Sequence, residues 1–349
     1  MSLERICVTI VTCNSGRYIR RCLESVLRQE GVTLEVIVVD NASTDNTREI
    51  LEELQCRTVR TIYSSCNLGF AEGQNRAIRA GDSEWVLTLN PDVLMRPGFL
   101  RNLLDAGRSD SRAGAICGKL LSIGPGFEPL QQPRIDSAGI YFTPAMRHFD
   151  RGWHEADERQ FDRAEYVFGA TAAAALYRRE MIEDISLDGE FFDRDFFIYR
   201  EDADVAWRAM LMGWRCLYVP AATAYHVRTA NPFNRRSLPA MMNMHSVKNR
   251  FLMRIKNVTA GVYRRHWLAM TWRDLVVVGA TMFWEPTSLA AFWHIARCLP
   301  RTLARRRAIM ARRRMPDEVL ALWFNYDPMA LPVATPALPA TARYVPDVA

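Results

Sequence analysis

Apolar positions in the first hundred residues follow two alternating periodicities. Short apolar runs typical of buried strands lie at 6–11, 34–39, 59–64 and 85–89. Segments with apolar residues at helical spacing lie between them, at 18–29, at 47–54 and from 67 through 78. Alternation of strands and helices at this spacing predicts a parallel sheet with helices on both faces.

The pattern changes twice further along the chain. Residues 122–134 are rich in Gly, Pro and Gln and predict a loop, whereas 166–177 predicts one buried strand with small residues at its centre. A short helix at 202–212 precedes a strand at 215–219. We therefore expect three parts: an α/β domain over 1–245, a basic helical extension over 246–320, and a Pro/Ala-rich tail over 321–349.

Composition indicates a folded globular protein. Of 349 residues, 49% are hydrophobic and 24% are charged, which is far from the composition of disordered chains. No basic segment followed by a long apolar stretch opens the chain, so we expect no signal peptide. The eight cysteines form no C-x-x-C pair, and several lie in apolar runs. These features favour buried thiols and a cytoplasmic protein over disulfides or a zinc site.

Positive charge is concentrated near the C-terminus. The net charge is +6, yet residues 297–314 contain eight arginines and no acidic residue. Four tryptophans, at 267, 272, 284 and 293, lie nearby. The apolar run at 275–284 is too short to span a bilayer, for which about 20 residues are needed.

Two hypotheses explain this basic segment. It could lie on an anionic membrane surface, as a peripheral helix with aromatic residues near the headgroups. Alternatively, it could pack on the catalytic core with a solvated basic face. No recognition motif for nucleic acid accompanies the arginines, so we expect no nucleic-acid partner.

Carboxylates follow the predicted strands at positions where ligands bind in α/β sheets. Asp40 ends the second strand, Asp92 follows the fourth in Asn90-Pro91-Asp92, and Asp202 opens the helix at 202–212. Each could be only a turn or helix-capping residue. Three such carboxylates in one domain, however, predict a converging polar site.

Each side chain suits a chemical role. Asp40 could accept the imide N–H of a uracil or thymine ring, and Asp92 could hold Mg²⁺ or Mn²⁺ against a diphosphate. Asp202, at a helix N-terminus that favours its charged form, suits a general base. His226 could be a further metal ligand or a structural histidine.

Three more residues could line a nucleotide cleft: Asn67, Gly69 and Asn75. Gly69 would allow close approach of the backbone to a ligand. The chain contains neither G-x-G-x-x-G nor G-x-x-x-x-G-K-[ST], so a dinucleotide-binding fold and a P-loop enzyme are not supported.

Five motifs in one order resemble those of family 2 glycosyltransferases. They lie at 9–15, 38–45, 67–71, 89–93 and 197–204. The resemblance covers about residues 5 to 230 and is greatest to the rhamnosyltransferase-like branch. It implies a GT-A fold, a mixed and mainly parallel sheet flanked by helices. It also implies a nucleoside-diphosphate-sugar donor, a divalent metal and inversion at the anomeric carbon.

The resemblance also implies roles for individual residues. Thr12, Asn14 and Asp40 match positions that bind the nucleotide, and Asp202 matches the catalytic base. Asp92 matches the last acidic residue of the D-x-D metal motif, in which Asn90 replaces the first Asp, as is usual in the rhamnosyl-like branch.

The expected function is transfer of a sugar, with L-rhamnose as the candidate, to a saccharide or lipid-linked saccharide. The spacing of residues does not distinguish a dTDP- from a UDP-sugar donor. One alternative is a glycosyltransferase-like binding module with impaired catalysis, favoured by Asn90. Another is a sugar nucleotidyltransferase, which would need a basic triphosphate loop where this chain offers only Arg17.

Overall fold

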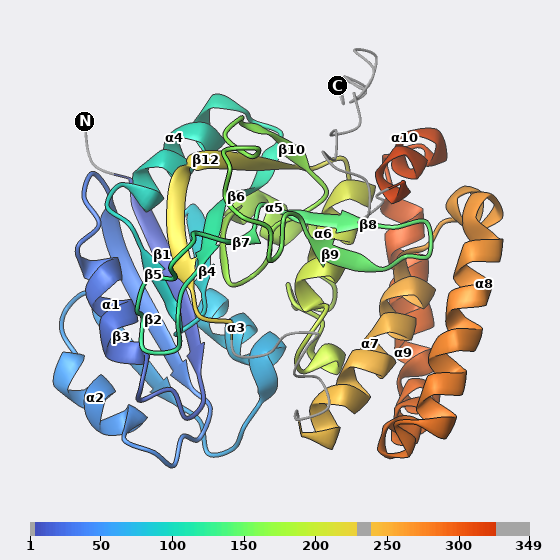
Figure 1. The fold of residues 1–349 in the computed structure, drawn as a ribbon, viewed down its shortest axis with the longest axis horizontal. Helices are drawn as coiled ribbons and strands as arrows, with labels where there is room; N and C mark the ends of the chain where they lie inside the picture. Colours follow the sequence, from blue (N-terminus) through green and yellow to red (C-terminus); the bar gives the residue numbers. More distant parts are fainter. Residues whose placement is uncertain (1–3, 229–238, 326–349) are drawn as a thin grey trace.

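A ten-stranded sheet forms the centre of the protein in the computed structural model, which describes residues 4–228 and 239–325 (Figure 1). Its main path runs in the order β10-β12-β6-β11-β4-β1-β2-β3, with β5 paired to β12 and β7 to β6. The strands are β1 (Arg5–Thr12), β2 (Thr33–Asp40), β3 (Val59–Tyr63), β4 (Trp85–Leu89), β5 (Val93–Met95), β6 (Ala113–Ser122), β7 (Ile135–Ser137), β10 (Glu165–Val167), β11 (Ala174–Arg178) and β12 (Arg215–His226). A separate hairpin pairs β8 (Ile140–Phe142) with β9 (His148–Asp150).

The four strands predicted in the first hundred residues form the parallel part of this sheet, which confirms the predicted α/β class. β1 pairs in parallel with β2 and β4, and β2 pairs in parallel with β3. Side chains alternate between the two faces: Ile6, Val8 and Ile10 enter one hydrophobic cluster, and Cys7 and Val11 enter the other.

Helices cover both faces, as the alternation predicts. One face packs against α1 (Ile19–Leu27), α2 (Thr47–Leu54) and α4 (Phe99–Ser109). The other packs against α3 (Gly69–Ala80), α5 (Arg179–Ile185) and α6 (Glu201–Leu211). The apolar stripe of each helix is therefore buried against the sheet.

The prediction of one strand over 166–177 was wrong. The segment forms two strands, β10 and β11, with a buried connection between them. A Cβ atom at Gly169 would lie 2.2 Å from Cβ of Ala206 in α6. The small residues that resemble a strand core in the sequence instead allow α6 to pack closely on this connection.

Helices dominate the C-terminal part, and they stand beside the sheet (Figure 1). They are α7 (Ala240–Asn257), α8 (Ala260–Phe283), α9 (Ala290–Arg312) and α10 (Asp317–Ala321), with short 3₁₀ turns η3 (Pro286–Leu289) and η4 (Leu322–Phe324). The expected division at 245/246 falls inside α7. Phe324 packs on Trp207 of α6, with ring centroids 4.9 Å apart. The helices thus share a core with the sheet domain. Most of the expected tail, from residue 326 onward, lies outside the described residues.

Much of the arginine block at 297–314 contacts the α/β domain. Arg305 is buried and pairs with Glu190 and Asp193, and Arg301 pairs with Glu190 and Asp195. Arg312 and Arg314 pair with Asp184 of α5, and Arg306 donates to the carbonyl of Ile255. These contacts support the packing hypothesis for the block.

Candidate active site

The predicted site residues lie along one edge of the parallel sheet. Thr12 at the end of β1 is paired in register with Asp40 at the end of β2. β4, the other neighbour of β1, ends at Leu89 and is followed by Asn90 and Asp92. Because these strands are parallel, their carboxyl ends meet at the same edge, where α/β proteins bind ligands.

Asp40 is fully buried and already has a cationic partner. Nε of Arg48 donates to its Oδ2 at 2.7 Å, and the Ser43 N–H lies 3.3 Å from both carboxylate oxygens. The pair with Arg48 explains how the charge is tolerated without solvent. The sequence analysis gave Arg48 no role, since an Arg at that position is also an ordinary helix-surface residue.

Asn14 joins the loops that follow β1 and β2. Its Oδ1 accepts from the N–H of Thr44 at 2.8 Å, and its own N–H donates to Oγ of Ser43. Its φ of 54° lies in the left-handed region, which Asn tolerates better than most residues. Thr12 Oγ1 is buried without a hydrogen-bond partner among the described residues.

The three predicted cleft residues in or near α3 have different surroundings. Asn67 accepts from the N–H of Gly69 at 2.8 Å and so shapes the turn into the helix. Gly69 has a φ of 76°, and a Cβ there would lie 2.5 Å from the ring of Phe197. Asn75 is buried and exchanges two hydrogen bonds with the backbone of Phe192. The side-chain amide of Asn75 therefore holds α3 against the segment that contains Phe192.

Asp92 begins a chain of alternating charges. Its Oδ1 lies 3.4 Å from Nε2 of His226, whose Nδ1 lies 2.7 Å from Oδ2 of Asp136. Arg228 bridges Asp136 to Oδ2 of Asp150 at 2.8 Å. The pairing of β12 with β5 sets His226 opposite Val93, and this places the ring beside Asp92.

These contacts set the protonation states of the charged side chains in this series. Burial disfavours a charged His226, but the carboxylates of Asp136 and Asp92 outweigh it and raise the pKa of the ring to about 10. Burial likewise opposes ionisation of Asp136, but Arg228 and His226 lower the pKa of its carboxyl to about 2. The sequence analysis missed Asp136, Asp150 and Arg228, because nothing in their spacing links residues so far apart in the chain.

Asp202 lies at the start of α6. Its Oδ1 accepts from the N–H of Ala203 at 2.7 Å, and its Oδ2 lies 3.5 Å from the N–H of Ala172. Burial, followed by the negative charge of Asp150, raises the pKa of its carboxyl to about 6, against the opposing effects of these N–H groups and Arg228. Asp150 and Arg228, whose charges act on Asp202, are also the last members of the series of ion pairs that begins at Asp92. Asp40 lies at the same sheet edge, where its carboxylate pairs with Arg48.

A divalent metal fits the donors beside Asp92. No group of three or more His, Cys, Asp or Glu side chains within 4–228 and 239–325 could hold a metal ion unaided. Asp92 and His226 offer one carboxylate and one imidazole nitrogen that face each other. The Nδ1 contact of His226 with Asp136 is the arrangement that orients metal-binding histidines. Diphosphate oxygens and water would have to complete the coordination.

Comparisons with known proteins identify a family. Residues 7–186 match the family described as "Glycosyl transferase family 2", which is more than half of the chain. The chain is also 30% identical over 237 residues to the N-acetylglucosaminyl-diphospho-decaprenol L-rhamnosyltransferase of Mycobacterium tuberculosis, over 63% of this chain and 75% of that protein.

The chain belongs to glycosyl transferase family 2. It is a glycosyltransferase that uses a nucleotide-sugar donor, which agrees with the leading hypothesis from the sequence. The family match leaves the nucleotidyltransferase alternative without support.

Solved structures share the fold of this family 2 glycosyltransferase. The mannosyltransferase of Pyrobaculum calidifontis in complex with GDP-Man and Mn²⁺ has a TM-score of 0.52 at 18% identity, over 93% of this chain and 88% of the other. The S. aureus protein TarS in complex with UDP-GlcNAc has a TM-score of 0.54 at 16% identity, over 88% of each chain. The predicted GT-A architecture with C-terminal helices is thus confirmed.

Proposed function

We propose that this glycosyltransferase inverts the anomeric centre of its donor, with Asp202 as the general base. The observation that carries the proposal is the carboxylate of Asp202 at the start of α6, held by the N–H of Ala203 and with a pKa of about 6. A base with a pKa in this range is ionised at neutral pH and can still accept a proton. Asp202 takes the proton of an acceptor hydroxyl. The oxygen of that hydroxyl attacks the anomeric carbon from the face opposite the diphosphate.

The leaving diphosphate needs positive charge at the Asp92 end of the series of ion pairs. The protonated ring of His226 supplies part of it. With the ring of His226 deprotonated at Nε2, Asp92 and His226 would instead hold Mg²⁺ or Mn²⁺, because histidine binds a metal only as the neutral imidazole. A bound cation would then neutralise the charge that develops on the leaving group. Asn90 offers no carboxylate to this site. We propose that Thr12, Asn14, Asp40, Asn67 and Gly69 form the nucleotide side of the cleft.

Substitution of Asp202 tests this assignment. We expect Asp202→Asn to reduce turnover by about 10²–10⁴-fold, the usual contribution of a positioned base. Asp184→Asn, in the exposed ion pairs with Arg312 and Arg314, is the control and should keep turnover. Turnover of Asp202→Asn near the wild-type level would exclude Asp202 as the base.

For the donor we propose dTDP-L-rhamnose, supported by the similarity to the mycobacterial rhamnosyltransferase. The same similarity, to a protein that acts on N-acetylglucosaminyl-diphospho-decaprenol, supports a lipid-linked saccharide as the acceptor. A thermal-shift screen of dTDP-, UDP- and GDP-sugars with Mg²⁺ or Mn²⁺ tests the donor, because a ligand that binds only the folded protein raises its melting temperature. Hydrolysis of the stabilising donor would separate an active enzyme from a binding module.

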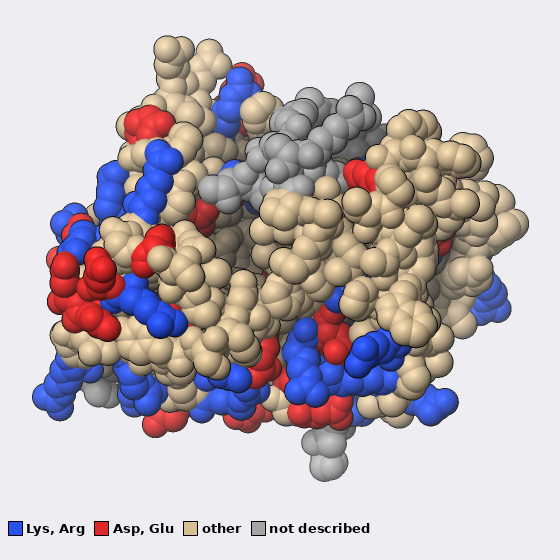
Figure 2. Space-filling model, turned by 90° about the horizontal axis from the view of Figure 1, so that it is seen from below, with Lys and Arg blue, Asp and Glu red and all other residues tan. Residues whose placement is uncertain are grey.

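We further propose that the protein binds the surface of an anionic membrane through an apolar ridge on α8, η3 and α9. The most exposed members of the ridge are Trp272, Phe283, Trp284 and Trp293, between 69% and 77% exposed. Figure 2 shows a broad uncharged surface over the helical end of the molecule. Large exposed apolar patches are rare in soluble monomers.

The charge around the ridge favours an anionic lipid surface. Residues 260–314 contain two acidic side chains, of which Asp274 pairs with Arg254, whereas Arg264, Arg265 and Arg297 are exposed. Among the described residues, no helix combines the length and apolarity needed to cross a bilayer. The ridge therefore suits contact with a lipid surface, through its aromatic residues more than through the buried arginines.

Vesicle co-sedimentation tests the membrane proposal. The double variant Phe283→Ser/Trp284→Ser should bind anionic vesicles less than the wild type. Leu130, an apolar residue on the sheet domain, is 37% exposed, and the control variant Leu130→Ser should bind as the wild type does. Deletion of 297–314 would be unsuitable, because it removes the buried Arg305. Equal vesicle binding by the wild type and both variants would contradict the proposal.

A further inference from the structure

The segment that leads into Asp202 has an unusual backbone. Phe197, Tyr199 and Arg200 have φ values of 64°, 70° and 69°. All three are bulky residues without a side-chain reason to adopt the left-handed region. Such conformations persist only where the surroundings impose them, and they concentrate at functional sites.

Helix α7 imposes this conformation through Asn249. This side chain is fully buried, and its Nδ2 lies 2.8 Å from each of three backbone carbonyl oxygens, those of Phe196, Ile198 and Tyr199. All three partners are acceptors, so the nitrogen of the amide must face them, and its two N–H groups are shared among the three carbonyls. The three carbonyls surround the residues with positive φ, and one side chain thus determines the path of the segment.

Other residues of α7 reinforce the same contact. The ring of His245 stacks on Phe197 with centroids 4.9 Å apart, and the carbonyl of Ser246 accepts from Nε of Arg200 at 3.2 Å. Positions 242, 245, 246 and 249 share one helix face, because side chains three and four residues apart lie side by side. This face of α7 follows the segment from 196 to 200.

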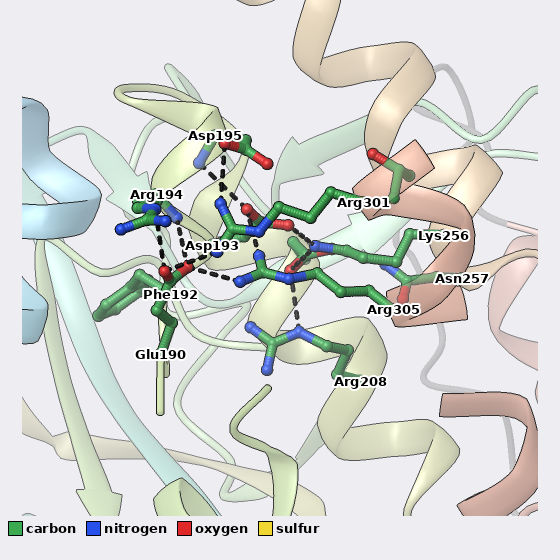
Figure 3. A network of polar contacts seen from close by, with 12 residues as sticks. Glu190, Phe192, Asp193, Arg194, Asp195, Arg208, Lys256, Asn257, Arg301 and Arg305 are labelled. Carbon is green, nitrogen blue, oxygen red and sulfur yellow. Dashed lines mark hydrogen bonds and ion pairs between the residues drawn. The ribbon is translucent and has the colours of Figure 1, made fainter. Parts of the chain in front are cut away.

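Helix α7 also contacts α6 just after the proposed base, at Asp204. Asp204 is fully buried and accepts from Nδ2 of Asn257 at 2.7 Å, and its other oxygen lies 2.9 Å from Nζ of Lys256. Figure 3 shows Lys256 and Asn257 reaching into a network that includes Asp193 and Arg305. Helix α7 therefore fixes α6 both before and after Asp202.

We propose that Asn249 is a positioning residue: it holds residues 196–200 in their left-handed conformation and thereby sets where α6 begins and where the Asp202 carboxylate lies. The proposal rests on the proposed role of Asp202 as the base. Under this proposal the C-terminal helices take part in catalysis, in addition to the proposed membrane contact.

The first test is Asn249→Ala in the full chain. Loss of the amide should lower kcat by about tenfold or more, since an ångström of misplacement costs up to about 10²-fold, while KM for the donor stays within about twofold. Gln29→Ala is the matched control. Gln29 is also a buried amide with three backbone partners, Ser25, Arg96 and Leu100, yet it contacts no residue of the proposed site. Its removal should leave kcat unchanged.

Two double variants separate positioning from general stability. In an Asp202→Asn background, Asn249→Ala should cause no further loss of turnover, because it acts through the missing carboxylate. Tyr199→Gly should partly restore kcat to Asn249→Ala, because glycine adopts positive φ without the amide. If Asn249→Ala does not fold, Asn249→Ser replaces it, because serine keeps one hydrogen-bond donor. Its kcat is then compared in the same two double variants.

The outcomes are distinct. Wild-type kcat in folded Asn249→Ala, or an equal proportional loss in the Asp202→Asn background, overturns the positioning role and leaves Asp202 as the base. Wild-type turnover in Asp202→Asn alone overturns the proposed function itself. Low kcat, constant KM and rescue by Tyr199→Gly together support the proposal.

Discussion

Nδ1 of His226 lies 2.7 Å from Oδ2 of Asp136, although the two residues are 90 positions apart in the chain. This contact fixes the orientation of the ring and directs Nε2 toward Asp92. It places an unpredicted carboxylate directly behind a predicted metal ligand. Several experiments examine how far the activity depends on such contacts.

Asp136→Asn should weaken metal binding without unfolding the protein. The amide cannot orient and polarise His226 as a carboxylate does, and loss of such a partner typically costs about 10–100-fold in metal affinity. The measurement is the Mn²⁺ concentration that gives half-maximal transfer after chelator treatment. Asp162→Asn, which removes the carboxylate that pairs with the buried Lys119, is the control. An unchanged Mn²⁺ requirement would show that the Asp136 contact has no part in metal use.

The pH dependence of transfer should reflect ionisation of Asp202. Its pKa of about 6 means that the base loses activity as the pH falls below that value. We expect kcat/KM to fall about tenfold per pH unit below 6 and to level off above it. A plateau that extends to pH 5 would contradict the assigned base.

Asp202→Asn should also stabilise the protein at neutral pH. The folded-state pKa of Asp202 is raised from 3.8 to about 6, so its contribution to stability is present below pH 4 and is lost as pH rises through 6. The uncharged amide avoids that loss, worth on the order of 2 kcal/mol at pH 7.5. Urea unfolding at pH 7.5 and pH 4 measures it. The gain should be largest at pH 7.5 and absent near pH 4; the reverse order would show that burial does not destabilise the charged form.

Arg305→Met should destabilise the whole protein. Arg305 is 3% exposed and pairs with Asp193 and Glu190, whose carboxylates would lose a buried cation. Breaking a buried pair on one side typically costs about 3–5 kcal/mol. Arg307→Met, at an exposed position of the same helix, should change the free energy of unfolding by less than about 0.5 kcal/mol. Equal, small effects for both variants would argue against a structural role for the block.

Gly69→Ala should reduce turnover more than its backbone strain alone explains. The new Cβ would lie 2.5 Å from the ring of Phe197, in the segment that precedes Asp202. Gly189→Ala is a matched control, since its φ of 74° is nearly the same and nothing lies within 4 Å of its Cβ. Both should lose about 1–2 kcal/mol of stability from the left-handed backbone, but only Gly69→Ala should also lose activity. Equal activity of the two variants would mean that contact with Phe197 is unimportant.

Local patterns in the sequence predict the parallel part of the sheet and the place of its carboxyl edge. Continuous apolar runs and helical spacing are local properties, so β4 and α2 were predicted with their observed bounds. Asp40, Asp92 and Asp202 could be found for the same reason, since each directly follows or opens such an element. The apolar run at 166–177 misled the prediction, because small residues suit a strand core and a close helix contact equally.

Which distant residues meet depends on how the elements pack in the folded protein. Asp136, Asp150 and Arg228 join Asp92 to the surroundings of Asp202, and Asn249 reaches the segment before it, through contacts between elements that no spacing encodes. The arginines at 297–314 carry the same charge in the sequence, yet the fold buries Arg305 in ion pairs and leaves Arg307 in solvent. Charge and periodicity are properties of the chain. Burial and partners belong to the folded protein, because they depend on which surfaces the packing brings together.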